Sequence, residues 1–259
     1  MTAGPVLEAR KVSKSFGGLR AVDDVSFAVT GGEILGIVGP NGAGKTTLFD
    51  VITGHTRPTS GEVLLDGRSL AGVPVHRRSR LGVARTFQHP TVAGSLTVAE
   101  NMLLAASFRR AGDRAGDRAG DGARGRAAGE VAAELLEFVG MADKAGRESG
   151  PLGVFDKKRL MLGTALAMNA RALLLDEPFG GLTPAEIDDT IGLIRRMRDR
   201  GLAVVCIEHV MRALTSLANR VLVMHHGATF FEGTPQEMLA DERVIEVYLG
   251  SRHRKGGAS

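Results

Sequence analysis

A glycine-rich stretch that begins at Gly39, GPNGAGKTT, has residue types and spacing that suit the binding of a phosphate chain. Gly39, Gly42 and Gly44 permit backbone conformations that side chains would block, so that backbone N–H groups can point inward at an anion. Lys45 offers a point charge to the β- and γ-phosphates, and the Thr46 hydroxyl suits Mg²⁺, which prefers oxygen ligands. The stretch matches G-x-x-x-x-G-K-[ST] between an expected strand and an expected helix, a context that a chance glycine-rich turn before a lysine would not share.

An acidic pair ends a second apolar run, in RALLLDEP at 171–178. A buried strand has no structural reason to end in Asp-Glu unless something there needs charge. We expect Asp176 to hold Mg²⁺, directly or through water, and Glu177 to orient and polarise an attacking water. The alternative is a pair of acids that face solvent at the end of a strand.

The elements that must position these residues are visible as short apolar runs separated by helix-length segments, which predict a mainly parallel sheet with right-handed crossovers. The runs are EILGIVG (33–39), RALLLDE (171–177), LAVVCIE (202–208) and RVLVMHH (220–226). Three earlier segments alternate more and carry turn signals, and they indicate an antiparallel sheet: VLEARKVSKSF, AVDDVSFAV and GEVLLDG. Three capping boxes mark helix starts at TVAE (97–100), TPAE (183–186) and TPQE (234–237).

Composition and charge exclude several classes of protein. The chain has 259 residues, of which 43% are apolar, enough to bury a core. No apolar run approaches the roughly 18 residues of a membrane helix, and the N-terminus has no apolar stretch that could act as a secretory signal. We therefore expect a cytoplasmic protein that meets membranes only through a partner. The net charge is +4, but the arginines are spread along the chain without interleaved aromatics, which argues against nucleic acid as a partner. The single cysteine, Cys206, lies in an apolar run and is expected to be a small core residue in a reducing compartment.

A threefold repeat, RAGDRAGDRAGD at 110–121, continues as GARGRAAG. Glycine is too frequent for a stable helix and the apolar content is too low for a core, so we predict a disordered insertion over 109–129 between two helices. Because alanine and arginine favour helices, a frayed helix is the alternative. A functional interpretation of the same segment is an arginine-rich contact to lipid headgroups.

The two motifs, with what lies between them, resemble the ATP-binding subunits of ABC transporters over nearly the whole chain. The likeness is greatest to subunits of branched-chain amino-acid and urea-type importers, and it is carried by VSKSFGGLRAVDDVSF (12–27), ARTFQ (84–88), LTVAEN (96–101), IEHVM (207–211), GTPQEML (233–239) and VIEVYLG (244–250). The resemblance implies an α/β fold: a RecA-like P-loop NTPase core with a mainly parallel sheet, an N-terminal antiparallel β subdomain and an inserted α-helical subdomain. The implied divisions are 1–89 (antiparallel subdomain and first part of the core), 90–166 (helical subdomain), 167–250 (second part of the core and a C-terminal helix) and 251–259 (a basic, disordered tail).

By the same resemblance Phe16 stacks on adenine, Gln88 touches Mg²⁺ or the attacking water and senses the transmembrane subunit, and His209 contacts the γ-phosphate. The alternatives are a core phenylalanine, a surface glutamine and a structural histidine. Glu208 is interpreted as structural. The full expected set comprises catalytic Glu177, His209 and Gln88, metal-binding Thr46, Gln88 and Asp176, and nucleotide-binding Phe16, Gly39, Asn41, Gly42, Gly44, Lys45, Thr46, Thr47, Leu152 and Gly153.

The segment L-G-V-F-D at 152–156 stands where the family has a signature close to LSGGQ, which completes the ATP site of a second cassette bound head to tail. Gly153 replaces the serine, whose hydrogen bond to a phosphate would contribute roughly 1.5–3 kcal/mol, and Val154 and Phe155 replace glycines where close approach is needed. Asp156 brings negative charge, although an aspartate before KKRLMLGTAL also suits a helix N-cap. A shift of this loop would instead let Gly153 and the basic residues KKR meet phosphate.

These observations predict the energy-coupling ATPase subunit of an ABC importer that uses ATP and Mg²⁺ to take up a small solute, with branched-chain amino acids favoured by the resemblance. The implied partners are transmembrane permease subunits, a second ATP-binding subunit and, indirectly, a solute-binding protein, at the cytoplasmic face of the plasma (inner) membrane. The altered signature favours a heterodimer, in which only one site hydrolyses ATP well, over a homodimer that carries the defect twice. The alternatives are a mainly regulatory ATP-binding subunit, a urea- or amide-type importer ATPase, and a non-transport ABC ATPase on ribosomes or DNA, against which the single cassette without heptads argues.

Overall fold

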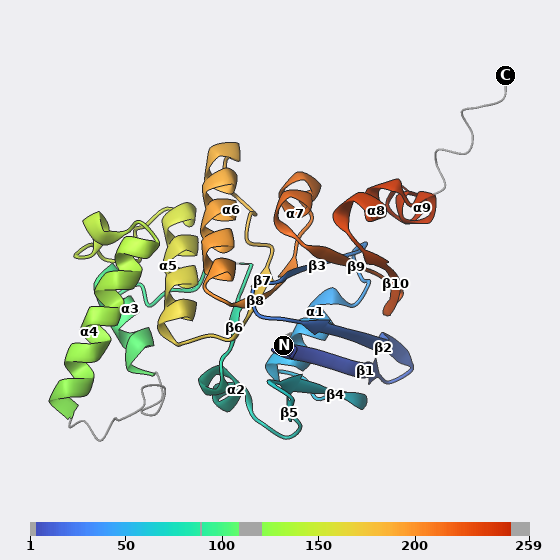
Figure 1. Cartoon of the computed structure of the whole chain (residues 1–259), viewed down its shortest axis with the longest axis horizontal. Coiled ribbons are helices and arrows are strands. Elements are labelled where there is room, and N and C mark those ends of the chain that lie inside the picture. Colours follow the sequence, from blue (N-terminus) through green and yellow to red (C-terminus); the bar gives the residue numbers. More distant parts are fainter. Residues whose placement is uncertain (1–3, 89, 109–120, 250–259) are drawn as a thin grey trace.

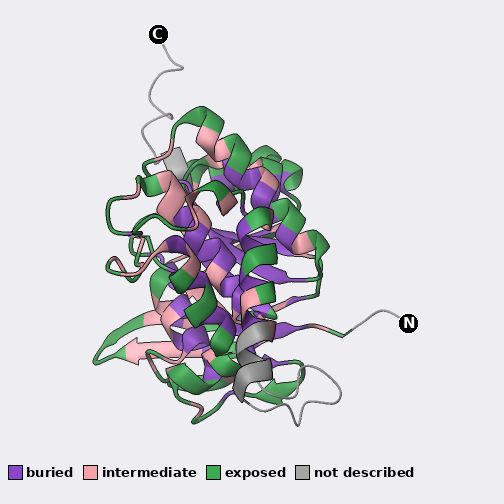
Figure 2. Cartoon of the chain, turned by 90° about the vertical axis from the view of Figure 1, so that its left-hand side faces the viewer, coloured by how far each residue is buried: buried purple, intermediate pink, exposed green. Residues whose placement is uncertain are grey.

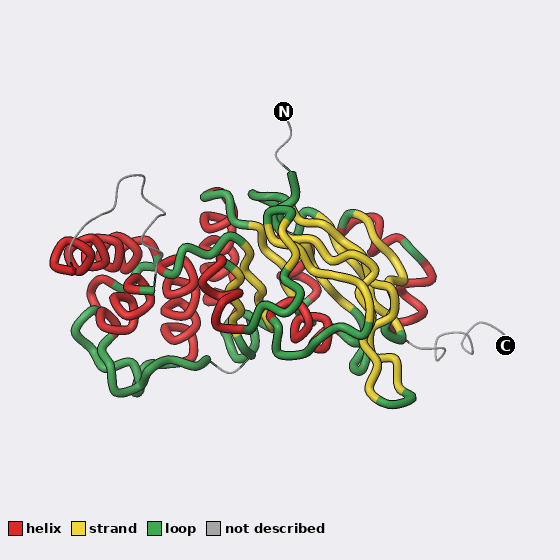
Figure 3. The backbone as a smooth tube through the Cα atoms, turned by 90° about the horizontal axis from the view of Figure 1, so that it is seen from below, coloured by secondary structure: helices red, strands yellow, loops and turns green. Residues whose placement is uncertain are grey.

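The structure, a computed structural model, describes residues 4–88, 90–108 and 121–249. At the centre of these residues lies a six-stranded sheet (Figures 1 and 3). Its strands, in spatial order, are β10 (Ala228–Gly233), β9 (Arg220–His225), β3 (Ile34–Val38), β8 (Ala203–Ile207), β7 (Ala172–Asp176) and β6 (Val83–Thr86). All neighbours are parallel except β10, which pairs antiparallel with β9. The four predicted strands of the parallel sheet are thus confirmed.

A second sheet is antiparallel, as predicted, and lies beside the central one (Figure 1). Its strands are β2 (Leu19–Val29), β1 (Leu7–Phe16), β4 (Ser60–Leu65) and β5 (Arg68–Ser69). Side chains of the central strands alternate between two faces. Leu174 and Val205 belong to a core shared with the second sheet and α1 (Lys45–Thr53), whereas Leu173 and Leu175 belong to a core shared with other helices. Because both faces are covered, the central strands can be apolar throughout.

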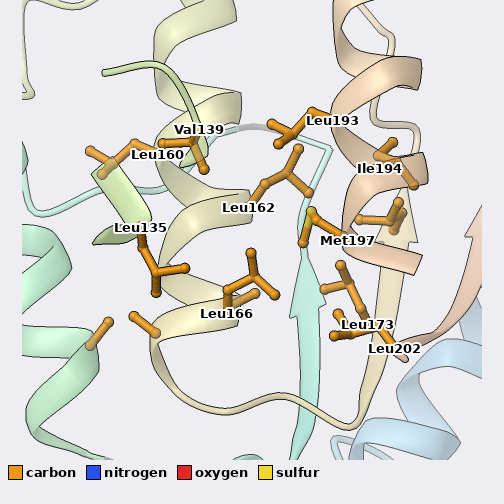
Figure 4. Close-up of a cluster of buried hydrophobic side chains, with 14 of the residues drawn as sticks. Leu135, Val139, Leu160, Leu162, Leu166, Leu173, Leu193, Ile194, Met197 and Leu202 are labelled. Carbon is orange, nitrogen blue, oxygen red and sulfur yellow. The ribbon is translucent and has the colours of Figure 1, made fainter. Parts of the chain in front are cut away.

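The remaining helices, except the first, cover the other face of the central sheet and extend beyond its β6 edge, whereas the first lies on the side of α1 (Figure 1). They are α2 (Val75–Leu81), α3 (Val98–Ser107), α4 (Asp121–Phe138), α5 (Val154–Ala167), α6 (Pro184–Asp199), α7 (Met211–Leu217), α8 (Pro235–Ala240) and α9 (Glu242–Leu249). Figure 4 shows Leu162 and Leu166 of α5 between α4 and α6, so that one apolar cluster joins the end group α3–α5 to the sheet. Buried residues run through the interior, and exposed residues lie on the outer faces of the helices (Figure 2).

The prediction of a disordered insertion over 109–129 is wrong for its later part. Residues 121–129 form the first half of α4. The helix has an apolar face whose buried members include Leu135, and tertiary packing of such a face stabilises a helix despite the low propensity of its glycines. The earlier part of the insertion lies outside the described residues, as does the expected tail at 251–259.

Local signals elsewhere are confirmed. In all three predicted capping boxes the threonine hydroxyl accepts the N–H of the third helical residue, and the glutamate accepts the N–H of the threonine. Cys206 is fully buried in β8, and burial raises the pKa of its thiol well above the ordinary value, as expected of a core residue. No helix among the described residues is long and apolar enough to cross a membrane.

Candidate functional site

The loop between β3 and α1 needs glycine at two positions because other backbone lies against it. Gly39 has a φ of 148° and Gly44 a φ of 98°, in the region that favours glycine. A Cβ on Gly39 would overlap the carbonyl oxygen of Met224, and one on Gly44 would overlap that of Ala21. The loop therefore has the strand–loop–helix context predicted for it, and strands from both sheets hold its backbone in place.

Lys45 lies within this loop rather than in solvent. It is 7% exposed, and its Nζ donates to the carbonyl oxygens of Gly39 at 2.6 Å and Pro40 at 3.0 Å. Burial lowers the pKa of Lys45, while the nearby carboxylates of Glu177 and Asp176 act in the opposite direction. The loop thus fixes one positive charge close to the acidic pair at the end of β7.

The two acids of that pair have different surroundings. The Asp176 side chain is 12% exposed and accepts a hydrogen bond from Arg85 at 2.7 Å. Glu177 has a φ of 48°, which is uncommon outside glycine, and its N–H donates to the carbonyl oxygen of Ile207 at 2.9 Å. Neither side chain is freely exposed, since that of Glu177 is 26% exposed. The alternative of two solvent-facing acids does not fit this arrangement.

The three residues expected to be catalytic meet at one carboxylate. Gln88 Nε2 donates to Glu177 Oε2 at 2.6 Å, and His209 Nε2 lies 3.0 Å from Glu177 Oε1. Gln88 follows β6, Glu177 follows β7 and His209 follows β8, so the cluster forms where neighbouring parallel strands end. Such a crevice at the carboxyl ends of strands is where open α/β sheets bind ligands.

An open cleft of about 540 Å³ contains most of the predicted nucleotide-binding residues. Its lining includes Phe16, Asn41, Gly42, Gly44, Lys45, Thr46, Thr47, Glu177 and His209. Phe16 is 52% exposed, so it is not a core residue; its ring lies at the edge of the cleft, with Lys14 Nζ 4.8 Å from the ring centre. Leu152 and Gly153 do not line this cleft, as expected if they serve the site of a second copy or subunit.

The segment that replaces the signature forms the start of α5. Gly153 is the N-cap residue and the helix begins at Val154, so the prediction of Asp156 as N-cap is wrong. Instead Asp156 lies in the first turn, where Lys144 Nζ binds both of its oxygens at 2.7 and 2.8 Å. The pairing compensates the negative charge that Asp156 brings to this end of the helix.

Three charged residues beside the site were not predicted from the sequence to contact it. Arg85 joins Asp176 to α1. Lys158 of α5 is buried and donates to the carbonyl oxygens of Glu177 at 3.1 Å and Pro178 at 2.9 Å, so this member of the KKR cluster is directed inward. Glu208, interpreted as structural, accepts the N–H groups of the next two residues at 3.0 Å and so shapes the turn that carries His209. The only sequence signal for these three residues is a charged residue next to an apolar run, which can indicate a buried charge.

Replacing Glu208 by glutamine should flatten the dependence of stability on pH. Burial raises the pKa of Glu208, so the folded chain keeps this proton to a higher pH than the unfolded chain. Its favourable contribution is therefore complete at low pH and is lost as the pH rises through the folded-state pKa. We expect urea unfolding at several pH values to show the stability of E208Q rising relative to the wild type from pH 4 to pH 7. Parallel curves for the two proteins would contradict this expectation.

Comparison with known proteins places the chain in one group. The family model described as "ABC transporter" matches residues 22–180, and one described as "Branched-chain amino acid ATP-binding cassette transporter" matches 229–254. The chain is 36% identical to the high-affinity branched-chain amino acid transport ATP-binding protein BraF of Pseudomonas aeruginosa, over 95% of this chain and 98% of BraF. It is 33% identical to the lipopolysaccharide export system ATP-binding protein LptB of Escherichia coli, over 96% of this chain and 98% of LptB.

A solved structure has the same fold. The ADP conformation of MJ1267, an ATP-binding cassette of an ABC transporter, matches with a TM-score of 0.82 and 27% identity, over 95% of this chain and 99% of that one. The likeness extends over both sheets and the helices at the end of the molecule, because it covers nearly the whole chain.

Proposed function

This chain belongs to the ABC transporter family and is an ATP-hydrolysing cassette, and from that premise we propose that it drives an importer of branched-chain amino acids. The observation that supports its role as the ATPase is the meeting of Gln88, Glu177 and His209 beside the cleft that contains Lys45. A lysine in a glycine loop can bind the phosphates, and a carboxylate opposite it can act on water. Phosphoryl transfer needs little more than such positioning and charge stabilisation.

In this proposal ATP occupies the cleft, with its adenine against Phe16 and its phosphates against the loop that contains Asn41 and Lys45, since all three residues line it. Thr46 and Asp176 offer the oxygen ligands that Mg²⁺ prefers, with Gln88 as a further candidate, so the residues present fit this ion. When bound, Mg²⁺ neutralises charge on the phosphates.

Glu177 accepts a proton from water as the water oxygen bonds to the γ-phosphorus and the bond to the β–γ bridging oxygen breaks. ADP and inorganic phosphate are the products. Both carboxylate oxygens of Glu177 already have partners, Gln88 on one and His209 on the other. The water must therefore displace or share one of these partners. This requirement links hydrolysis to the segment that contains Gln88, which the family resemblance places next to the transmembrane subunit.

The second half of each ATP site comes from another cassette, and the chain's own contribution is weak. At the start of α5 the serine hydroxyl of the family signature is missing, and Val154 and Phe155 stand in place of glycines. Val154 is 45% exposed, so its side chain projects toward whatever approaches this helix. We therefore favour a heterodimer with a second ATP-binding subunit, which supplies a working signature to Glu177 of this chain.

The proposed cargo is a branched-chain amino acid. The proposed location of the chain is the cytoplasmic face of the inner membrane, where it binds permease subunits. A solute-binding protein delivers the amino acid to these permease subunits. The BraF relative and the family model at 229–254 support this cargo. LptB, by its name, serves lipopolysaccharide export. The match at 229–254 favours the amino-acid importer over an exporter of that kind.

Uptake of radiolabelled leucine tests this assignment. We expect cells of the source organism that lack the chain to lose leucine uptake, and to regain it with the wild-type chain but not with Lys45→Ala, which removes the phosphate-binding charge. Urea uptake, measured in the same cells, tests the alternative cargo. Unchanged leucine uptake in the deletion strain would contradict the proposal.

A further inference from the structure

Arg85 is a buried arginine that joins the helix after the phosphate loop to the end of β7. Its side chain is 7% exposed. One terminal nitrogen donates to Asp50 Oδ1 at 2.6 Å, and the other donates to Asp176 Oδ2 at 2.7 Å. One guanidinium therefore bridges two carboxylates that are far apart in the sequence.

The position of Asp50 on α1 connects the Arg85 bridge to the expected metal-binding residues. Asp50 lies four residues after Thr46 on α1, so both residues are on the same face of the helix, one turn apart. Asp176, at the other end of the bridge, is the second residue expected to hold Mg²⁺. Arg85 thus connects the two elements that carry the metal-binding oxygens, Thr46 through Asp50 and Asp176 directly.

Two aromatic rings fix the plane of the guanidinium. The Arg85 Cζ lies 5.5 Å from the ring centre of Phe49 on α1, and 5.0 Å from that of Phe87, which precedes Gln88. A planar fork that contacts two rings and is hydrogen-bonded at both terminal nitrogens has little freedom to rotate. Among buried side-chain polar atoms of the described residues, the Arg85 Nε lacks a hydrogen-bond partner, so the terminal nitrogens carry all of its hydrogen bonding.

We propose that Arg85 is a positioning residue that sets the distance between Thr46 and Asp176, and thereby the affinity of the ATP site for Mg²⁺. This inference rests on the proposed function, because it takes these two residues as metal ligands. Without Arg85 the carboxylates of Asp50 and Asp176 lose their shared partner and repel each other, since an uncompensated charge in a buried site is costly. Asp176 would then turn away from the position that the metal requires.

The test measures how a fluorescent ATP analogue binds to the purified full-length chain as MgCl₂ is titrated. We expect Arg85→Met to raise the Mg²⁺ concentration for half-maximal binding about tenfold, the scale seen when partners of metal ligands are removed. Binding of the analogue in excess EDTA should stay as in the wild type. Arg85→Lys, which keeps the charge but not the planar fork, and Asp50→Asn should shift the Mg²⁺ requirement in the same direction and remain usable if Arg85→Met fails to fold.

Arg78→Lys is the matched control. Arg78 is also a buried arginine, 5% exposed, but it belongs to α2 and donates to backbone carbonyls near the C-terminal end of α1, those of Val51 and Ile52. We expect R78K to lower the melting temperature without changing the Mg²⁺ requirement. An unchanged Mg²⁺ requirement in the Arg85 variants, or an equal loss of binding with and without Mg²⁺, would overturn the role of Arg85. A wild-type chain that fails to bind the analogue at all would instead overturn the proposed function.

Discussion

The Glu177→Gln variant should bind ATP as the wild-type chain does and hydrolyse it more slowly by a factor of about 10² to 10⁴, the range for loss of a general base. Glutamine keeps the shape of the side chain and can still pair with Gln88 and His209, but it cannot take a proton from water. The phosphate loop and Lys45 are untouched, so the ground-state contacts of the nucleotide remain. The loss should therefore fall on kcat rather than on KM.

Phosphate release and binding of a fluorescent ATP analogue, measured on the same preparation, check this expectation. The protein should be studied together with an ATP-binding subunit that has a working signature, so that the hydrolysis rate of the wild type is high enough to compare. Glu62→Gln is the control, because Glu62 belongs to β4 and lies outside the cleft. A rate that falls less than about tenfold would show that another group accepts the proton, since loss of the base should cost more.

Residues that act through local backbone geometry were predictable from the sequence. The glycines of the phosphate loop, the threonine–glutamate capping boxes and the acids at the end of a strand all depend on neighbours within a few residues. The family resemblance assigned Gln88, Glu177 and His209 to one reaction centre, but the strand before Gln88 and the contacts of Gln88 and His209 with Glu177 were not predicted. For these residues the structure adds the distances.

Contacts between distant segments were not predictable in this way. The partners of Arg85 lie 35 and 91 residues away in the sequence, and nothing local to ARTFQ indicates them. Lys158 belongs to the basic run KKR, for which the sequence suggested a contact to phosphate, yet burial lowers its pKa and it donates to two carbonyl oxygens beyond β7. Strand β6 has only four residues, too few for a periodic pattern. Asp156 was misassigned because its partner, Lys144, lies in a separate turn.

Restoring the signature should have the second large effect. The triple variant Gly153→Ser, Val154→Gly and Phe155→Gly replaces the missing hydroxyl and removes the two side chains that block close approach. We expect it to raise ATP hydrolysis by the chain alone about 10- to 100-fold, the equivalent of one charge-assisted hydrogen bond. Asp156 is retained, because its pairing with Lys144 stabilises the first turn of α5.

The triple variant should also lower the stability of α5, and this loss of stability must be measured separately from the gain in ATP hydrolysis. Each new glycine in α5 destabilises the helix by roughly 0.5–1 kcal/mol, and loss of Phe155 removes the ring that lies 5.0 Å from the Arg159 guanidinium. A melting curve therefore accompanies the rate measurement. Phe155→Leu, which keeps the bulk but not the ring, is the control that should lose the same stacking without gaining activity.

A mixing experiment shows whether the repaired signature acts on the ATP site of a second cassette or on the ATP site of its own chain. The triple variant that also carries Glu177→Gln should hydrolyse ATP by itself at least about 10²-fold more slowly, but it can offer its repaired signature to a wild-type partner. If the two ATP sites form between cassettes, adding it to the wild-type chain restores hydrolysis, because the intact Glu177 then faces a working signature. The rate should rise with the concentration of the added variant and saturate as the mixed dimer forms. No gain on mixing, together with high activity of the triple variant alone, would mean that the altered start of α5 acts within its own chain, and the asymmetric pairing would have to be abandoned.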